Sequence, residues 1–186
     1  YVLGLLNPLT VTAGAAAALA VAYHQGAAES EAFNKSLIMT GNSAGVTAGQ
    51  LGDMAKRISA VSGTQSQAAA ALAEMASSTR IGSQNLESFS RVAVQLEKTL
   101  GIPLAETRKA FEELGKAPVD ASRKLNEATN YLTGALYQQI RALEDQGKAT
   151  DAAELAQRSY AQAMLSRTRD LEANLSLIEK AWKGIT

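Results

Sequence analysis

The sequence predicts an all-α protein. Alanine, leucine, glutamine and glutamate, which favour helices, are abundant, whereas prolines number three and aromatic residues make up 5% of the 186 residues. Apolar residues recur at steps of three and four, the period of a helix with one buried face. Serine or threonine opens these runs and glycine closes them about every 18 residues, which indicates a bundle of short helices rather than a solenoid of longer repeats.

Charge and residue usage narrow the function classes. The 18 basic and 18 acidic residues give a formal net charge of zero, so no long-range field draws the chain to nucleic acid or to an anionic membrane. Cysteine is absent, and the one histidine, His24, is best explained as a residue at a helix interface. Histidine dyads and multi-histidine zinc sites therefore lack their residues. We predict no enzyme activity, and no catalytic, metal-binding or cofactor-binding residue.

Residues 1–40 are predicted to form an apolar, alanine-rich N-terminal helix. Asn7-Pro8 fits an N-cap followed by proline in the first turn. Residues 1–28 contain no charged side chain and exceed the roughly 20 apolar residues that cross a bilayer. Because alanine is only marginally apolar and Pro8 and Gly14 interrupt the run, packing against other protein is the favoured interpretation and membrane insertion the alternative. The chain does not begin with methionine, which indicates a piece of a longer protein.

Residues 41–117 are predicted to be a cluster of short helices. Gly41 ends the first helix, and Thr47 and then Thr64 or Ser66 begin the next two. Isolated helices shorter than about 12–15 residues are marginal in water, so these segments must bury their apolar faces against one another. The faces expected inward are Leu51, Met54, Ala55, Ile58 and Val61 in the first segment, and Ala68, Leu72, Met75 and Ala76 in the second.

Two further helices complete the cluster. Ser83 begins the first, Gly101 ends it and Pro103 precedes the second. Their apolar positions are Leu86, Phe89, Ala93, Leu96 and Leu100, then Leu104, Phe111 and Leu114. We expect the chain to turn back on itself at five helix-ending glycines, which are Gly41, Gly63, Gly82, Gly101 and Gly115.

Residues 118–186 are predicted to form a long antiparallel helical hairpin. The first arm, 119–146, is weakest at Thr133-Gly134 and ends at Gly147, and Thr150 caps a second arm that has no glycine or proline as far as Trp182. The apolar lines are Leu125, Leu132, Leu136, Ile140 and Leu143 in the first arm, and Leu155, Tyr160, Met164, Leu171, Leu175, Ile178 and Trp182 in the second. Packing within the hairpin is favoured for the second line, and a self-associating coil is the alternative. All three parts are expected to form one folded unit.

Three polar motifs are explained without a binding or catalytic site. Glu112-Glu113 and Glu144-Asp145 diverge around a helix because each pair is adjacent in sequence, which favours solvent-exposed faces. The segment "GNSAGVTAG" lacks the Lys-Ser/Thr of a phosphate loop. Acids at 154, 170, 172 and 179 offset the basic residues of the last helix, which disfavours a nucleic-acid surface; these basic residues are Arg158, Arg167, Arg169, Lys180 and Lys183.

Five segments in a fixed order carry a family resemblance. They are "SLIMTGNSAGVTAGQL", "SGTQSQAAAALAEMA", "GIPLAETRKAFEELGKAPVDASRKLNE", "YLTGALYQQIRALEDQG" and "ANLSLIEKAW". Together they resemble the folded region toward the N-terminal side of the tail length tape measure proteins of long-tailed bacteriophages and prophages. The resemblance extends from Asn7-Pro8 to Trp182 and depends on the order of the segments, since no single motif is specific.

The resemblance implies a structural role in tail assembly and DNA delivery. Such proteins occupy the lumen of the tail tube, set its length and leave it as DNA is delivered. The implied partners are tail tube proteins, tail tip proteins and tail assembly chaperones. The implied locations are the virion tail, the host cytoplasm during assembly, and the host envelope during delivery through residues 1–28. The family has no catalytic residue to transfer to this region.

Two other classes of function remain as alternatives. A helical adaptor or scaffolding domain would bind a partner protein through residues 47–116, and the hairpin around 131–160 is weakly similar to a single tetratricopeptide-like unit without a second copy. A membrane-active helical protein would depend on residues 1–28 alone.

Overall fold

The computed structural model describes residues 45–183, with side chains as far as Leu177 except that of Ala48. Seven α-helices, one 3-10 helix and no strand lie in this part of the chain, which confirms the all-α prediction. The elements are α2 (Ala48–Ser59), α3 (Gln65–Ala76), η1 (Ser83–Asn85), α4 (Leu86–Leu100), α5 (Leu104–Lys116), α6 (Pro118–Thr129), α7 (Gly134–Asp145) and α8 (Ala149–Lys183).

The starts of α2 and α3 follow from the sequence. Thr47 and Thr64 are the N-caps, and each accepts a hydrogen bond from the backbone N–H three residues later. The glutamines at those positions, Gln50 and Gln67, accept in return from the backbone N–H groups of the threonines at 2.8 and 2.9 Å. These reciprocal capping boxes satisfy two otherwise unpaired donors at each helix start. The predicted openings at Thr47 and Thr64 are confirmed.

The predicted glycine stops are confirmed in part. Gly101 follows α4 with φ +68°, and Gly147 lies between α7 and α8 with φ +73°, the left-handed conformation that closes a helix. Gly63, with φ +72°, lies in the turn between α2 and α3. Gly82, in contrast, has φ −69° and precedes η1 several residues after α3 ends, and Gly115 lies inside α5. The prediction of a stop is wrong at these two positions.

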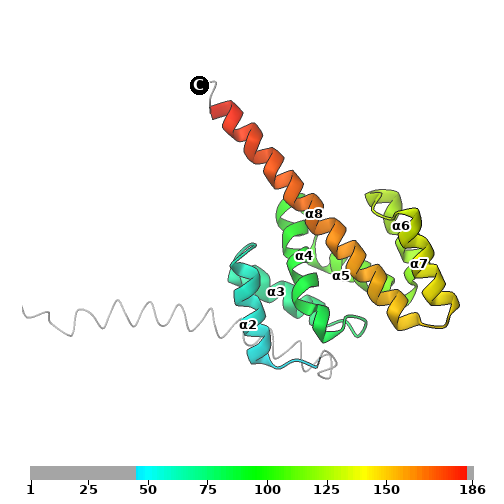
Figure 1. Cartoon of the computed structure of the whole chain (residues 1–186). Coiled ribbons are helices and arrows are strands. Elements are labelled where there is room, and N and C mark those ends of the chain that lie inside the picture. Colours follow the sequence, from blue (N-terminus) through cyan, green and yellow to red (C-terminus); the bar gives the residue numbers. More distant parts are fainter. Residues whose placement is uncertain (1–44, 184–186) are drawn as a thin grey trace, which may run out of the picture.

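The core lies where α4 and α5 meet the first half of α8, with α2 and α3 packed on one side and α6 and α7 on the other (Figure 1). Phe89 of α4 stacks on Phe111 of α5 with ring centroids 4.1 Å apart. Tyr160 of α8 meets Phe111 edge-on at 5.7 Å, and Tyr131 meets Tyr160 at 5.3 Å. Edge-to-face and offset contacts of this kind add to the burial of the rings. This aromatic row joins the consecutive helices α4 and α5 to α8, which is remote from them in sequence.

The first arm of the predicted hairpin is two helices rather than one. Asn130 ends α6 in the left-handed conformation, with φ 46°, and Asn126 Oδ1 accepts a hydrogen bond from the backbone N–H of Leu132 at 2.7 Å. The chain then turns, Thr133 caps α7, and α6 and α7 lie beside each other (Figure 1). The sequence placed the weak point at Thr133-Gly134; the break begins three residues earlier. The second arm is a single helix from Ala149, so Thr150 lies in its first turn and is not its cap.

Four residues expected inward are exposed instead. Val61 follows the end of α2 and is 66% exposed, and Leu100, the last residue of α4, is 51% exposed. Leu171 and Leu175 lie on the C-terminal half of α8 and are 39% and 59% exposed. The helical period assigned each of them to a buried face. Val61 lies after its helix has ended, and the other three lie where their helices extend past the core.

Several expectations lie outside the described residues. They include the helix over 1–40, its end at Gly41, the membrane alternative for 1–28 and the place of His24. The side chains of Ile178, Lys180, Trp182 and Lys183 also lie outside.

Candidate functional site

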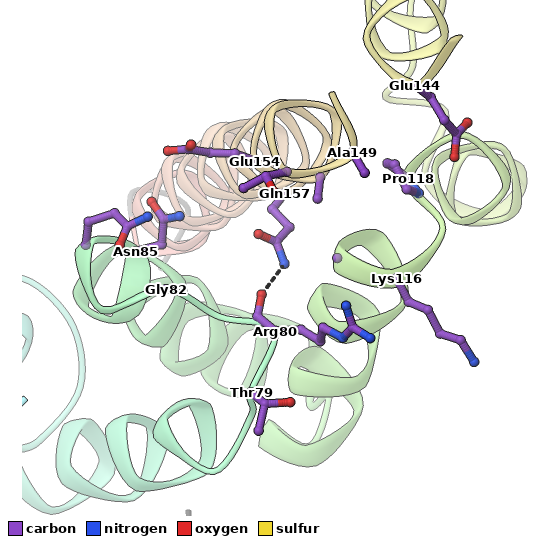
Figure 2. A pocket seen from close by; sticks show the side chains of 14 residues that line it. Thr79, Arg80, Gly82, Asn85, Lys116, Pro118, Glu144, Ala149, Glu154 and Gln157 are labelled. Atoms are coloured by element: carbon purple, nitrogen blue, oxygen red, sulfur yellow. Dashed lines mark hydrogen bonds between the residues drawn. The ribbon is translucent and has the colours of Figure 1, made fainter. Parts of the chain in front are cut away.

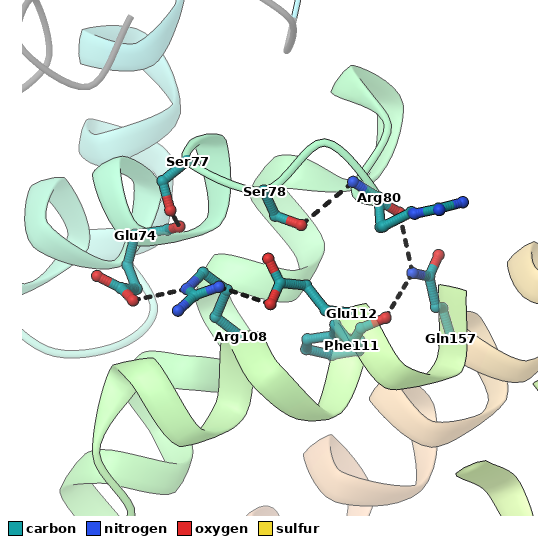
Figure 3. A network of polar contacts seen from close by, with 8 residues as sticks. All are labelled: Glu74, Ser77, Ser78, Arg80, Arg108, Phe111, Glu112 and Gln157. Carbon is teal, nitrogen blue, oxygen red and sulfur yellow. Dashed lines mark hydrogen bonds and ion pairs between the residues drawn. The ribbon is translucent and has the colours of Figure 1, made fainter. Parts of the chain in front are cut away.

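A polar junction joins α8 to the segment that connects α3 with η1. Gln157 of α8 is 3% exposed, and its Nε2 donates hydrogen bonds to the backbone oxygens of Arg80, at 3.1 Å, and of Phe111, at 2.8 Å. Figure 3 shows this amide reaching between the loop and α5. Because a buried polar group costs free energy unless it is paired, the two bonds fix the position of α8 against both neighbours.

Gly115 makes this junction sterically possible. A Cβ atom at position 115 would lie 2.9 Å from Gln157 Nε2 and 3.2 Å from the backbone oxygen of Arg80. Both distances are shorter than ordinary van der Waals contacts. The glycine that the sequence assigned to a helix stop therefore serves as a packing position inside α5.

A cleft of about 320 Å³ opens beside this junction (Figure 2). The segment 79–85 forms one wall, the end of α5 and the start of α6 form another, and the first turns of α8 form the third. Its volume is at the lower end of the range for small-ligand pockets. The polar and charged side chains that line it include Arg80, Asn85, Lys116, Glu144, Glu154 and Gln157.

An ion-pair network fixes α5 to α3 next to the junction. Arg108 Nε donates to Glu74 Oε1 at 2.7 Å, and Arg108 Nη1 pairs with Glu112 Oε2 at 2.6 Å (Figure 3). The hydrogen bond to Glu74 raises the pKa of Arg108 further above its ordinary range, so the guanidinium stays charged. Glu113 turns away toward Lys124, at 3.6 Å, so the predicted divergence of Glu112 and Glu113 is confirmed.

Two of the three arginines of α8 make contacts within the protein. Arg158 donates from Nε to Asn85 Oδ1 at 3.3 Å and pairs with Glu154. Arg167 Nη2 donates to the backbone oxygen of Asn130 at 3.1 Å, which ties α8 to the end of α6. The sequence had treated these residues as one side of a solvated helix and gave no signal for these partners, which come from segments 37 and 73 residues away.

The buried tyrosines give the fold a dependence on alkaline pH. Burial raises the pKa of both Tyr131 and Tyr160, with a smaller opposing contribution from the Ser122 hydroxyl at Tyr131 and from Arg167 at Tyr160. Above a pH of about 10, the ordinary tyrosine pKa, the unfolded chain loses these protons while the folded chain keeps them. The unfolded state then binds fewer protons than the folded state, so the free energy of unfolding falls as the pH rises.

We expect this fall to be visible in urea unfolding between about pH 9 and 11. Comparison with Tyr160→Phe at each pH isolates the contribution of one hydroxyl, because lysine titration is common to both proteins. The difference between the two proteins should shrink or reverse as the pH rises. A constant difference over this range would contradict the assignment.

The C-terminal half of α8 projects beyond the core as an exposed helix (Figure 1). Thr168 is buried, and Glu172 forms an ion pair with Lys98 of α4 at 3.2 Å, the most C-terminal ion pair among the described residues. Beyond it, Leu175 and Leu177 are 59% and 63% exposed. This half of the helix therefore presents apolar side chains to solvent.

The described part of the chain contains neither a cluster of metal-binding side chains nor a helix that could span a membrane. No group of three or more metal-binding side chains occurs there. Of the helices that the structure describes, none is both long and apolar enough to cross a bilayer.

The described residues form a helical module with a polar cleft at its centre and one helix that extends beyond the core. The chain belongs to the family described as prophage tail length tape measure protein, whose model matches residues 1–141. The resemblance noted in the sequence is thereby confirmed. No solved structure matches the chain.

Three tape measure proteins are similar along most of this chain. That of Pseudomonas phage PAJU2 is 29% identical over 185 residues, which is 100% of this chain and 20% of the relative. That of Escherichia phage N15 is 25% identical over 165 residues, and that of Escherichia phage lambda is 24% identical over 170 residues. These matches cover 88% and 91% of this chain, and again 20% of each relative. The chain thus spans about a fifth of the length of these relatives.

Proposed function

We propose that this chain is a folded assembly module of a phage tail tape measure protein, and that the part of the protein that measures tail length lies elsewhere. The observation that carries this proposal is the folding-back of α2 to α7 over one core shared with α8. A continuous helix extends about 1.5 Å per residue, so 186 residues in one helix would span roughly 280 Å. Helices of 12 to 15 residues that reverse direction cannot extend the chain at this rate.

In-frame deletion of the codons for residues 45–168 tests the proposal in a phage that encodes the chain. If the segment were part of the ruler, tails would shorten by about 190 Å, at 1.5 Å for each of the deleted residues. We expect few or no tails, and no population of that length, because the module acts in assembly. The matched control is a deletion of equal length in the remainder of the gene. Viable particles with tails shortened in proportion would contradict the proposal.

The proposal includes the partners and locations that the family resemblance implies. The chain would contact tail tube proteins, tail tip proteins and tail assembly chaperones, first in the host cytoplasm and then in the lumen of the virion tail, and would take part in DNA delivery. We propose that it does so without catalysis and without sequence-specific binding of nucleic acid. Residues 41–117 and 118–186 would act as parts of one folded unit. Cross-linking of purified tails, followed by identification of the linked peptides, tests these contacts. The absence of any link from residues 45–183 to a tail protein would argue against them.

Self-association through α8 is a further part of the proposal. The positions Leu171, Leu175, Ile178 and Trp182 follow one another at steps of four, three and four, as the core positions of a coiled coil do, and Leu171 and Leu175 are exposed. The change Leu171→Lys with Leu175→Lys should shift sedimentation of the chain toward the monomer. Arg169→Lys with Ser176→Lys, also on the exposed part of α8, is the control and should have no effect. Equal association by all three forms would exclude this surface.

We also propose that residues 1–28 contact the host envelope when DNA is delivered. Their lack of charge supports this proposal. Flotation of the chain with liposomes, with and without these residues, measures the contact. Equal binding by both forms would exclude it.

A further inference from the structure

Two buried carboxamides line the cleft with fixed orientations. Gln157 is 3% exposed and Asn85 is 4% exposed, and both lie on the side formed by η1 and α8 (Figure 2). The neighbours of Gln157 Nε2 are two carbonyl oxygens, which accept and do not donate, so the amide cannot be reversed. Asn85 Oδ1 accepts from Arg158 Nε, which fixes the opposite end of that amide as the donor.

Each carboxamide keeps one polar atom without a partner among the described residues. Gln157 Oε1 is a free acceptor, and Asn85 Nδ2 is a free donor. Neither atom is among the fully enclosed unpaired polar atoms of the described residues, so both are open to a ligand in the cleft. A cleft of about 320 Å³ is large enough for a ligand that supplies one donor and one acceptor. Backbone amides of a peptide carry this combination.

The charges around the cleft favour a negative group on that ligand. Arg80 and Lys116 have no ion pair in the described part of the chain, whereas Glu154 is neutralised by Arg158. Pro118, the first residue of α6, and Ala149, the first residue of α8, also line the cleft, so the first turns of two helices border it. The positive ends of helix dipoles stabilise carboxylates. Glu144 is the remaining acid on the cleft wall without an ion pair among the described residues.

We propose that the cleft binds an extended peptide segment that carries an acidic side chain. A backbone N–H of the segment donates to Gln157 Oε1, and a backbone carbonyl accepts from Asn85 Nδ2. The carboxylate lies toward Arg80 and the helix N-termini. Acetate has no donor for Gln157 Oε1, whereas a peptide offers its backbone N–H. The inference does not depend on the role in tails, since it concerns recognition of a peptide by the chain itself.

Titration of the ¹⁵N-labelled 186-residue chain tests the proposal. The probe is an acetylated, amidated tripeptide, glycine–aspartate–glycine, with glycine–asparagine–glycine and sodium acetate as comparisons. The aspartate peptide should shift the side-chain NH₂ signals of Asn85 and Gln157. The asparagine peptide should bind about tenfold more weakly, as expected for loss of a charge-assisted contact. Acetate should shift these two signals less than either peptide.

Two variants keep the test independent of folding. Asn85→Asp retains the oxygen that accepts from Arg158 but replaces the free donor by an oxygen, and Arg80→Glu changes an exposed side chain while its backbone oxygen still accepts from Gln157. Arg80→Glu should keep the thermal midpoint, and both variants should lose about tenfold or more in affinity for the aspartate peptide. Arg123→Glu, an exposed cation that does not line the cleft, should bind as the unchanged chain does.

The proposal is overturned if the aspartate peptide gives no shift, or if acetate binds as strongly, which would mean an adventitious anion site only. It is also overturned if Arg80→Glu binds the aspartate peptide unchanged. None of these results would affect the tail-length deletion, so failure of the peptide site and failure of the assembly role are distinguishable.

Discussion

Replacement of Phe111 by alanine should lower the free energy of unfolding by about 3–5 kcal/mol, the usual cost of removing a fully buried aromatic ring. Phe111 is completely buried and contacts Phe89 of α4 and Tyr160 of α8, so the cavity would lie where three helices meet. Domains of this size are typically stable by about 5–15 kcal/mol, so the loss is a large share of the total. Urea unfolding followed by circular dichroism measures it.

Two variants serve as controls for this loss. Phe111→Leu keeps most of the buried volume and should cost clearly less than the alanine change. Leu177→Ala removes an apolar side chain that is 63% exposed and should change the stability by less than about 0.5 kcal/mol. A loss for Phe111→Ala as small as that for Leu177→Ala would contradict the position of the ring in the core.

Replacement of Gly115 by alanine should destabilise the protein by about 1–3 kcal/mol, even though alanine is the better helix former. The added Cβ would lie 2.9 Å from Gln157 Nε2 and 3.1 Å from Arg80 Cβ. To relieve these contacts, Gln157 must move away from the two carbonyl oxygens to which it donates. Thermal unfolding and urea titration of the variant measure the loss.

Gly134→Ala is the matched control. Gly134 is the first residue of α7, and a Cβ there would meet nothing within 4 Å. Its φ is not positive, so alanine should leave the stability unchanged or raise it by up to about 1 kcal/mol. If Gly115→Ala were also neutral or stabilising, Gly115 would not be a packing position, and the close approach of α5 to α8 would be wrong.

Helix starts and stops were predictable where they depend on neighbouring residues. Thr47 and Thr64 cap their helices through bonds that span three residues, and Gly101 and Gly147 adopt positive φ. These effects are local, so the sequence pattern contains them. The break at Asn130 was missed because asparagine in the left-handed conformation is only one of several options for that residue, and the contact of Arg167 with Asn130 O comes from a distant helix.

The candidate site was not predictable in the same way. Gln157, Arg80 and Asn85 had no motif to mark them. Gln157 meets Arg80 across 77 residues, and Arg158 meets Asn85 across 73 residues. Glu144 is exposed, as expected for a solvated face, but the sequence did not show that it also lines the cleft. A helical period reports which face of a helix is apolar, but it does not report which polar residues on other helices will lie opposite.

By itself the sequence determined the helical class, several helix starts and ends, and the family, because propensity, capping and the order of similar segments are properties of the chain read in one dimension. The tertiary structure alone decided which apolar residues are buried, the role of Gly115 and the existence of the cleft. The physical reason is that burial, close approach and the pairing of buried polar groups depend on which helices pack together. The period that buries Met164 continues to Leu175, and only the end of the core determines that one is covered and the other exposed.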